Sequence, residues 1–364
     1  MSITSEISRI QTNIANAYTA AKAKGATMPV TENSDNIPNA IQSLNGTKGL
    51  WIALASNKMF TSPNGVIWTE QSNPNELTVM TYGKGYWDYL SQNFYSQPRF
   101  IGLKGADTTN VIKTTIDGTN WSDWDIYFSA RWSHICCCDE FGFFGVIARG
   151  SSDFALLGVI GGPKFTMPTN QNWGGLAYGN YKFIAVNEAG NRICRAAVAT
   201  DNSDPGVSSP YVVFGNFIVP PAAFSSTNKV RRARYLNGKF YIVGQSNSYL
   251  YSSDGNTWST GTFPTLDSGE SNAWFDIAYG AGKYIAINRS TQQSLAISTD
   301  GINWTKTNLS NNGKVYRNII YANNKFIITG ESTASFYYSE DGTNWKSGLF
   351  PSSASIESIA YGEL

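Results

Sequence analysis

The chain has 364 residues, and its 27 Lys and Arg balance 26 Asp and Glu to a formal net charge of +1. Because a dedicated binder of nucleic acid or of anionic membranes needs a basic surplus, this balance argues against both classes. Charged residues make up only 15% of the chain and aromatic residues 14%, with 34 glycines. That composition is typical of a β-rich protein whose polarity comes from Ser, Thr and Asn. No apolar run reaches about 18 residues, so we expect no membrane insertion.

The N-terminal residues are expected to form an amphipathic helix. Apolar residues recur there at alternating spacings of four and three, which is a heptad pattern. They are Ile3, Ile7, Ile10, Ile14, Ala17 and Ala21. Isoleucine at both seam positions favours three or more strands, so we expect the four isoleucines to drive self-association into a trimer. Docking on a different protein and packing on the chain's own main domain are the alternatives.

Gly25 is expected to end this helix, and a second short helix is expected to begin at Ser34 or Asp35. The segment from Ile7 to Leu44 resembles the N-terminal attachment segments of tail fibre and receptor-binding proteins in phages and phage-tail-like bacteriocins of Gram-positive bacteria. The resemblance implies a protein of a virion or tail-like particle, assembled in the bacterial cytoplasm and released by lysis. Its implied partners are tail and baseplate proteins.

The rest of the chain is repetitive. A seven-residue box occurs as SSDGNTW (252–258), STDGINW (298–304) and SEDGTNW (339–345), with looser copies SPNGVIW (62–68) and TIDGTNW (115–121). A second element precedes the boxes and consists of two alternating apolar runs around a Gly or Asn turn, as in FDIAYGAGKYIAI (275–287). This alternation indicates a β-hairpin. The unit therefore predicts a blade of four antiparallel strands.

The tyrosine of the hairpin element measures the repeat, with Cys137 in the place of one missing member. The tyrosines are Tyr82, Tyr178, Tyr235, Tyr279, Tyr321 and Tyr361. A period of about 40 to 50 residues is typical of a β-propeller. The last copy stops at Leu364 after one strand, whereas residues 49–68 supply the second to fourth strands without a first. Pairing these two ends would remove both exposed sheet edges.

We therefore predict two parts, a helical oligomerisation or attachment segment over residues 1–48 and an all-β, seven-bladed β-propeller over residues 49–364. The propeller is expected to close by pairing Glu357–Tyr361 with Trp51–Leu54. The predicted blades are 357–361 with 49–70, about 76–123, 132–173, 174–216, 229–260, 273–306 and 315–347.

The seven-residue box resembles the Asp-box of sialidase-like and related propellers, except that Asp directly precedes Gly. The aspartate can accept backbone N–H groups across its own turn, the glycine can take positive φ, and the tryptophan can pack the hairpin onto its blade. We therefore expect a structural role for these residues. They are Asp117, Asp254, Asp300, Asp341, Trp121, Trp258, Trp304 and Trp345.

The cysteines and the single histidine are expected to be structural. Cys136, Cys137, Cys138 and Cys194 match neither a disulfide framework nor a pair of zinc knuckles, and we interpret them as small buried hydrophobes. His134 has no partners for a zinc site and is expected to pack at an inner strand. No metal and no cofactor is therefore predicted.

A sialidase needs converging arginines, a tyrosine nucleophile and an aspartate acid/base. The chain lacks the Arg-Ile-Pro element that sialidases carry near the start of the propeller. Arg231 and Arg232 open an inner strand and could reach the channel, but a structural ion pair is the simpler interpretation. We therefore expect no enzymatic activity, with a glycoside hydrolase acting on cell-surface polysaccharide as the alternative.

The other class of function is recognition. Loops between blades and between second and third strands share one face, and aromatic, amide and hydroxyl groups there suit a bacterial surface glycan or surface protein. The expected ligand contacts are Trp124, Asp125, Tyr127, Phe224, Asp267, Glu270, Arg289 and Gln292. The hairpin insertion at 84–98 is expected on the opposite face, against a neighbouring subunit. The sequence thus predicts a tail-fibre-like receptor-binding protein.

Overall fold

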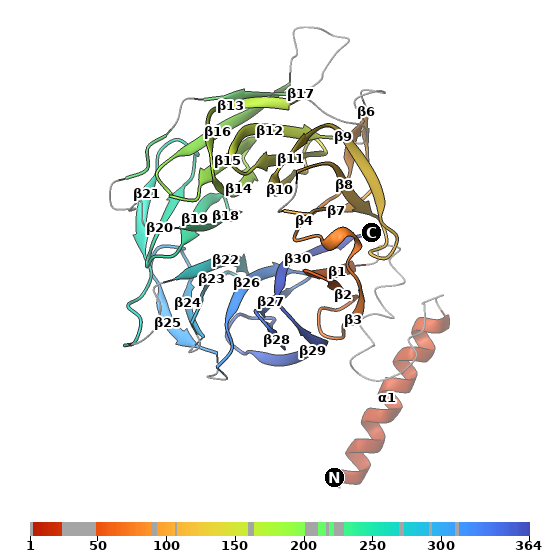
Figure 1. The fold of residues 1–364 in the computed structure, drawn as a ribbon. Coiled ribbons are helices and arrows are strands. Elements are labelled where there is room, and N and C mark those ends of the chain that lie inside the picture. The colour runs from red at the N-terminus through yellow and green to blue at the C-terminus, as the bar shows by residue number, and fades with distance from the viewer. Residues whose placement is uncertain are drawn as a thin grey trace.

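The computed structural model describes residues 3–23, 49–88, 93–105, 108–158, 164–200, 210–215, 218–221, 229–268, 273–290, 293–309 and 313–364. In this part of the chain the first element is the helix α1 (Ile3–Ala23), as predicted, and all of the strands follow it. Figure 1 shows the strands as a ring of blades around a central axis, with α1 outside the ring. The second helix predicted from residue 34 lies outside the described residues.

Seven four-stranded antiparallel sheets form the blades, and each runs from an inner strand at the channel to an outer strand at the rim (Figure 1). The closing blade contains β30 (Ile356–Glu363), β1 (Gly49–Ala55), β2 (Lys58–Ser62) and β3 (Thr69–Ser72). With the inner strand first, the second blade contains β4 (Val79–Gly83), β7 (Arg99–Leu103), β8 (Thr109–Thr115) and β9 (Ser122–Ala130), and the third contains β10 (Trp132–Cys138), β11 (Phe143–Ala148), β12 (Ser151–Leu157) and β13 (Lys164–Gln171). The fourth blade contains β14 (Trp173–Gly179), β15 (Lys182–Asn187), β16 (Ile193–Thr200) and β17 (Pro210–Phe214), and the fifth contains β18 (Val230–Leu236), β19 (Lys239–Gly244), β20 (Ser248–Ser252) and β21 (Ser259–Thr262). The sixth blade contains β22 (Trp274–Gly280), β23 (Lys283–Asn288), β24 (Ser294–Ser298) and β25 (Thr305–Asn308), and the seventh contains β26 (Tyr316–Ala322), β27 (Lys325–Gly330), β28 (Thr333–Ser339) and β29 (Lys346–Ala354). The predicted all-β, seven-bladed propeller is confirmed.

The two ends of the propeller meet in one blade. Strand β30 pairs with β1 from Gly49↔Glu363 to Ala55↔Ile356, with Trp51 opposite Tyr361. Trp51 is fully buried, and its ring lies 4.9 Å from that of Tyr361. The predicted closure between the start and the end of the propeller is therefore confirmed, and it places β1 between β2 and β30 instead of leaving it as an exposed edge.

Neighbouring blades pack through the tyrosines that measured the repeat. A Cβ added at Gly179 would lie 2.1 Å from the Tyr235 ring of the next blade, and one at Gly280 would lie 2.0 Å from the Tyr321 ring. These two tyrosines thus cover a glycine of the preceding inner strand so closely that no side chain fits between them, as does Tyr82 over Gly362. The Tyr-Gly pair recurs in the sequence because it sets the spacing between blades.

The boxes form the turns between third and fourth strands. In each of the four boxes that contain aspartate, the aspartate Oδ1 accepts the backbone N–H groups two and three residues later; for Asp254 these come from Asn256 at 2.7 Å and Thr257 at 2.8 Å. Gly255 has φ +73°, and the Trp258 ring is buried behind the turn. In the closing blade, Asn64 accepts the corresponding N–H groups at 2.9 Å. Box positions therefore need an acceptor oxygen rather than a charge.

Replacing Asp254 is expected to separate the effect of its acceptor oxygen from the effect of its charge. Asp254→Ala removes both hydrogen bonds and should lower the free energy of unfolding by about 1 kcal/mol. Asp254→Asn should lose less at pH 7, since Asn64 holds an equivalent turn. The measurement is urea unfolding of the three proteins, and an Asn variant as unstable as the Ala variant would contradict this account.

The same variants should respond to pH. The N–H groups of Thr257 and Asn256 lower the pKa of Asp254 from 3.8 to about 2. A lowered folded-state pKa means that the ionised carboxylate stabilises the fold above pH 3.8 and loses this effect as the pH falls through 2. Any stability advantage of the wild type over Asp254→Asn should therefore shrink over this interval.

Deleting residues 355–364 should unfold the propeller rather than fray its end. The deletion removes β30, uncovers β1 as an edge and exposes the fully buried Trp51. We expect a loss of more than about 5 kcal/mol, which in a protein of ordinary stability prevents cooperative folding. Thermal melting followed by near-UV circular dichroism measures it. Deleting residues 1–10 instead is the control and should leave the melting temperature unchanged; a C-terminal deletion that melts like the wild type would show that closure is dispensable.

Candidate binding site at the channel mouth

The two faces of the propeller differ in what they present. On one face lie the hairpins and the boxes, as shown by hydrogen bonds from Lys325 Nζ to the Asn64 carbonyl and from Lys283 Nζ to the Asp341 carbonyl, both 2.9 Å. We call this the box face. The chain enters the propeller there, because Gly49 pairs with Glu363 at the end of β30. The inner strands begin at the opposite face, which we call the mouth face.

The mouth of the channel is a polar cavity of about 270 Å³, which continues into a deeper one of about 130 Å³. The first is near the lower end of the range for small-molecule sites. Its wall is built by repeated register shifts: in five inner strands, and again where β30 meets β1, one extra residue interrupts the pairing just inside the strand's first residue. These residues, all of which line the cavity, are Ser133, Gly174, Arg231, Phe275, Arg317 and Glu357.

We refer to these six residues as the bulge ring. A β-bulge leaves its extra residue outside the ladder of hydrogen bonds and redirects its side chain. In six of the seven blades, a bulge of this kind places one residue, whose type differs between blades, at the channel mouth. In the second blade β4 pairs without a shift, and Thr78, just before that strand, lines the cavity instead.

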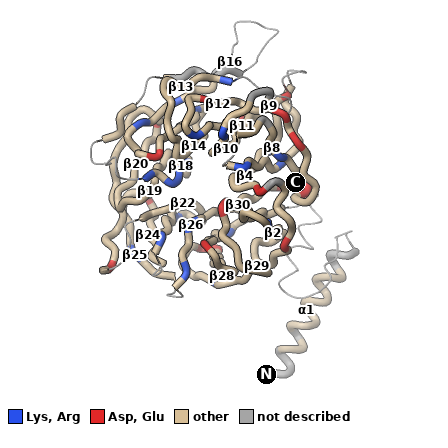
Figure 2. The backbone as a smooth tube through the Cα atoms, in the orientation of Figure 1, with Lys and Arg blue, Asp and Glu red and all other residues tan. Residues whose placement is uncertain are grey.

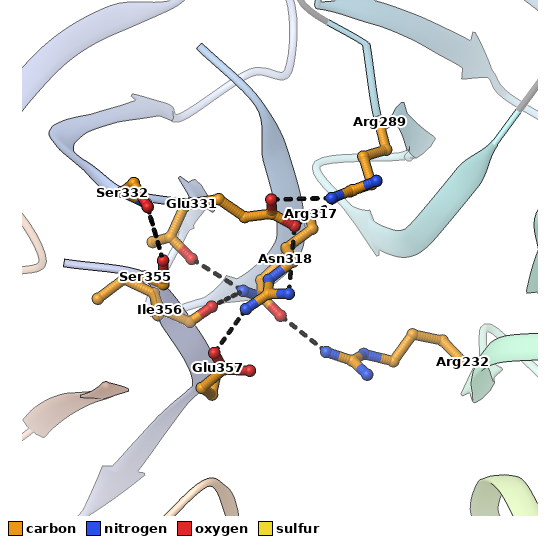
Figure 3. Close-up of polar contacts among 10 residues, drawn as sticks. Arg232, Arg289, Arg317, Asn318, Glu331, Ser332, Ser355, Ile356 and Glu357 are labelled. Carbon is orange, nitrogen blue, oxygen red and sulfur yellow. Dashed lines mark hydrogen bonds and ion pairs between the residues drawn. The ribbon is translucent and has the colours of Figure 1, made fainter. Parts of the chain in front are cut away.

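One side of the mouth carries a continuous chain of ion pairs (Figure 3). Arg289 donates to both oxygens of Glu331, at 3.0 and 2.9 Å. Arg317 lies 3.2 Å from Glu331 and 2.6 Å from Glu357. Burial acts to raise the pKa of Glu331, but the hydrogen bond from Arg289 and the charge of Arg317 outweigh it and lower the pKa. These four side chains neutralise one another. On another side, Arg149 pairs with Glu188 at 2.8 Å.

Below the mouth lies a second group of charges around Asp276, which is fully buried. Its oxygens accept two hydrogen bonds from Arg234, at 3.0 and 2.8 Å, and one from the Ile277 N–H at 2.9 Å. Arg232 lies 3.6 Å from the same carboxylate and donates to Asn318 at 2.7 Å. The expected structural ion pair is therefore confirmed for Arg232, and Arg234 shares it.

Arg231 does not share it. Among the described residues its side chain makes no hydrogen bond or ion pair, and its Nε is buried without a partner. Its guanidinium lies over the Phe275 ring, 5.0 Å from the ring centre, and Arg289 lies over the same ring at 5.3 Å. Burial lowers the pKa of Arg231, as do the charges of Arg289 and Arg317. An arginine nevertheless stays charged at pH 7. Figure 2 shows basic segments along β18, on which Arg231 lies, beside the channel.

His134 lines both cavities next to these arginines. Its Nδ1 lies 3.0 Å from the Ser133 hydroxyl. Burial, together with the charges of Arg232 and Arg149, lowers the pKa of His134 to about 4. The ring is therefore neutral at pH 7 and can accept or donate a hydrogen bond in the channel, whereas the sequence suggested only a packing role.

The cysteines are free thiols. Cys138 and Cys194 are buried as predicted, whereas Cys136 and Cys137 are half-buried. Burial raises the pKa of both Cys138 and Cys194 to about 12. Over the residues that the structure describes, no cluster of His, Cys, Asp or Glu could hold a metal ion, and no helix has the length and apolar character of a membrane span.

The predicted ligand contacts that the structure describes have separate surroundings. Trp124 is largely buried, 8% exposed, with its ring packed against Arg99 at 4.9 Å and against Tyr86, and its role as a ligand contact stays a prediction. Asp125 is exposed but belongs to β9, because the predicted loop 122–132 is largely strand. Asp267 is exposed and pairs with Lys306. Tyr127 has a side chain outside the described part of the structure, and Phe224, Glu270 and Gln292 lie outside it altogether.

Of the described residues in that set, Arg289 reaches the mouth, where it bonds Glu331. The sequence indicated that Arg231 could reach the channel, but the other five residues of the bulge ring were missed. A bulge does not appear as a change in the hydrophobic periodicity of a strand, and the six ring positions have different neighbouring residues. One signal was available: aligning the inner strands on their tyrosines puts Arg231, Phe275, Arg317 and Glu357 at one position, four residues before the tyrosine.

The hairpin insertion forms β5 (Tyr86–Asp88) and β6 (Asn93–Tyr95). It extends the β4–β7 hairpin, on the box face as predicted. The Trp87 N–H donates to the Gly142 carbonyl at 2.9 Å, so the insertion leans on the next blade. Phe94 and Tyr95 are 43% and 42% exposed. Contact with a neighbouring subunit stays a prediction.

No protein-family model matches the chain, and no curated protein matches its sequence. Its fold is similar to that of solved propellers. A putative 6-phosphogluconolactonase from Bacteroides uniformis matches with a TM-score of 0.60 at 10% identity, over 87% of this chain and 99% of that one. Virginiamycin B lyase from Staphylococcus aureus matches with 0.54 at 11% identity, over 74% and 84%. A streptogramin B lyase matches with 0.55 at 9% identity, over 78% and 98%.

These likenesses correct one expectation. We predicted from the sequence that the chain is not an enzyme, but the propellers that it resembles in shape include lyases and a putative lactonase. Since propellers of this shape include enzymes, the prediction that the chain is not an enzyme is wrong as a conclusion from the fold. At such low identity the likeness shows the fold alone, so it assigns no reaction to this chain.

Proposed function

We propose that the chain is a receptor-binding protein of a phage or phage-tail-like particle. In this proposal the propeller recognises a bacterial surface glycan or surface protein, and the N-terminal helix attaches the propeller to the particle or to other copies of the chain. The observation that carries the proposal is the position of the channel mouth. It opens on the face opposite to the one at which the chain enters the propeller.

This polarity suits a carried binding head. A stalk that joins the box face leaves the mouth face and its charged cavity free to meet a target. The cavity offers guanidinium, carboxylate, amide and imidazole groups within one opening, which are the groups that bind the hydroxyl and acidic groups of surface polymers.

The helix supports the attachment half of the proposal. Ile7 and Ile10 are 51% and 47% exposed, although they belong to the same apolar stripe. An exposed stripe of this spacing is stabilised when other helices cover it. Several heads on one particle would also raise the apparent affinity for a surface that presents many copies of a weak ligand.

Envelope binding tests the recognition half. The purified full chain is incubated with cell-envelope preparations from candidate Gram-positive hosts, and retention is measured together with the release of reducing ends. We expect saturable retention, weakened about tenfold by Arg289→Gln through loss of a charged contact at the mouth. Retention should be unchanged in a variant with Phe94→Ser and Tyr95→Ser on the box face.

Three other results of this experiment have distinct meanings. Release of reducing ends with turnover would favour the glycoside hydrolase instead. Loss of retention only in the box-face variant would move the site to that face. A folded protein that no envelope retains would overturn the proposal.

Light scattering tests the attachment half. We expect the full chain to be a trimer and the variant with Ile7→Asp and Ile10→Asp to be a monomer, because the carboxylates would be buried in the seam. Thr12→Asp with Asn16→Asp, on exposed positions of the other side of the helix, is the control and should stay trimeric. A monomeric wild type would contradict self-association and leave docking on a tail or baseplate protein.

A further inference from the structure

The feature that calls for an explanation is a single arginine at the channel mouth. Of the channel arginines, Arg149, Arg232, Arg234, Arg289 and Arg317 each pair with a carboxylate at 3.6 Å or less. Arg231 pairs with none in the described part of the chain, and its buried Nε has no acceptor. A buried donor without an acceptor costs free energy that a paired one does not. The fold therefore keeps one guanidinium at the mouth that a ligand could complete.

The guanidinium is nevertheless held in place. It lies over the Phe275 ring at 5.0 Å, and Arg289 lies over the same ring at 5.3 Å and is itself fixed by Glu331. Contact with a ring face uses the face of a guanidinium and leaves its N–H edge available. An edge of this kind matches the two oxygens of a carboxylate or a phosphate. Phe275 thus positions Arg231 without consuming its donors.

The charge balance of the channel favours the same ligand. In the described part of the chain, six arginines, the five above and Arg231, face four carboxylates, Glu188, Asp276, Glu331 and Glu357. This local surplus of two positive charges is larger than the net charge of the whole chain, which is +1. His134 adds no charge at pH 7, since its pKa is lowered to about 4. A positive surplus inside a narrow opening concentrates anions there.

We infer that the channel mouth binds one anionic group, a carboxylate or a phosphate, on the free edge of Arg231. The cavity of about 270 Å³ has room for that group and the sugar or polyol that bears it. The inference deepens the proposed function and rests on it for the choice of ligand, an acidic polymer of the bacterial surface. The anion site itself does not depend on what carries the protein.

The test uses the full chain and two small anions. Glucuronate carries a carboxylate and glycerol 3-phosphate a phosphate, with glucose and glycerol as neutral controls. We expect at least one anion to bind with a dissociation constant in the low millimolar range or below, by titration calorimetry, and to shift the Nε–H resonance of Arg231. Which anion binds identifies the group.

Two variants locate the site. Arg231→Gln should weaken anion binding about tenfold or more with little change of the melting temperature, since the variant loses the contact with the Phe275 ring but no hydrogen bond or ion pair within the described part of the chain. Lys239→Gln removes the same charge from the same blade at the box face and should leave binding within about twofold. Arg231→Lys should recover part of the affinity, because it restores the charge but not the fork.

Two results would overturn the inference. One is anion binding by Arg231→Gln equal to that of the wild type, and the other is a folded wild type that binds neither anion. The envelope assay separates this failure from that of the proposed function. Equal retention of wild type and Arg231→Gln by an envelope would leave the receptor role and remove the anion site. Binding of small anions without retention by any envelope would do the reverse.

Discussion

The pairing of β1 with β30 is the constraint on which the rest of the structure depends. It joins residues more than three hundred positions apart, Gly49 with Glu363, and so turns an array of blades into a ring. Only a closed ring has a channel of fixed width, and the channel is where the arginines converge. The closing strand also supplies Glu357, which holds Arg317 at 2.6 Å. Closure therefore stabilises the fold and completes the wall of the candidate site together.

Within the ring, the end of an inner strand serves the scaffold and its start serves the candidate site. The tyrosine and glycine near the end of most inner strands fix the distance between blades, and they recur because that distance is the same around the ring. The bulge near the start of the strand places one residue outside the ladder in six of the seven blades. The residue at this position differs between blades, and it is Arg231, Phe275, Arg317 and Glu357 in four successive blades.

This division also explains what the sequence could and could not predict. The blades and their closure were predictable because the markers are local: a tyrosine in a hairpin, an Asp-Gly turn, a truncated last copy. The site was not, because Arg231 meets Phe275 and Arg289 only across two blades. The aspartates and aromatic residues around Trp124 favour a loop, whereas the segment is the outer strand β9; the Trp124 ring is buried in a hydrophobic cluster and against Arg99, 25 residues earlier in the chain, which the sequence does not connect with it.

At the two levels of the channel, arginine side chains serve opposite purposes. At Asp276 a fully buried carboxylate is satisfied by Arg234, Arg232 and backbone N–H groups, so removing any partner would leave an unpaired buried charge. That arrangement fixes the inner strands and leaves little to offer a ligand. At Arg231 the guanidinium is fixed by a ring and its donors stay unused. A charge that the fold positions but does not pair gains most from a ligand that supplies the missing acceptor, because its ordering has already been achieved before binding.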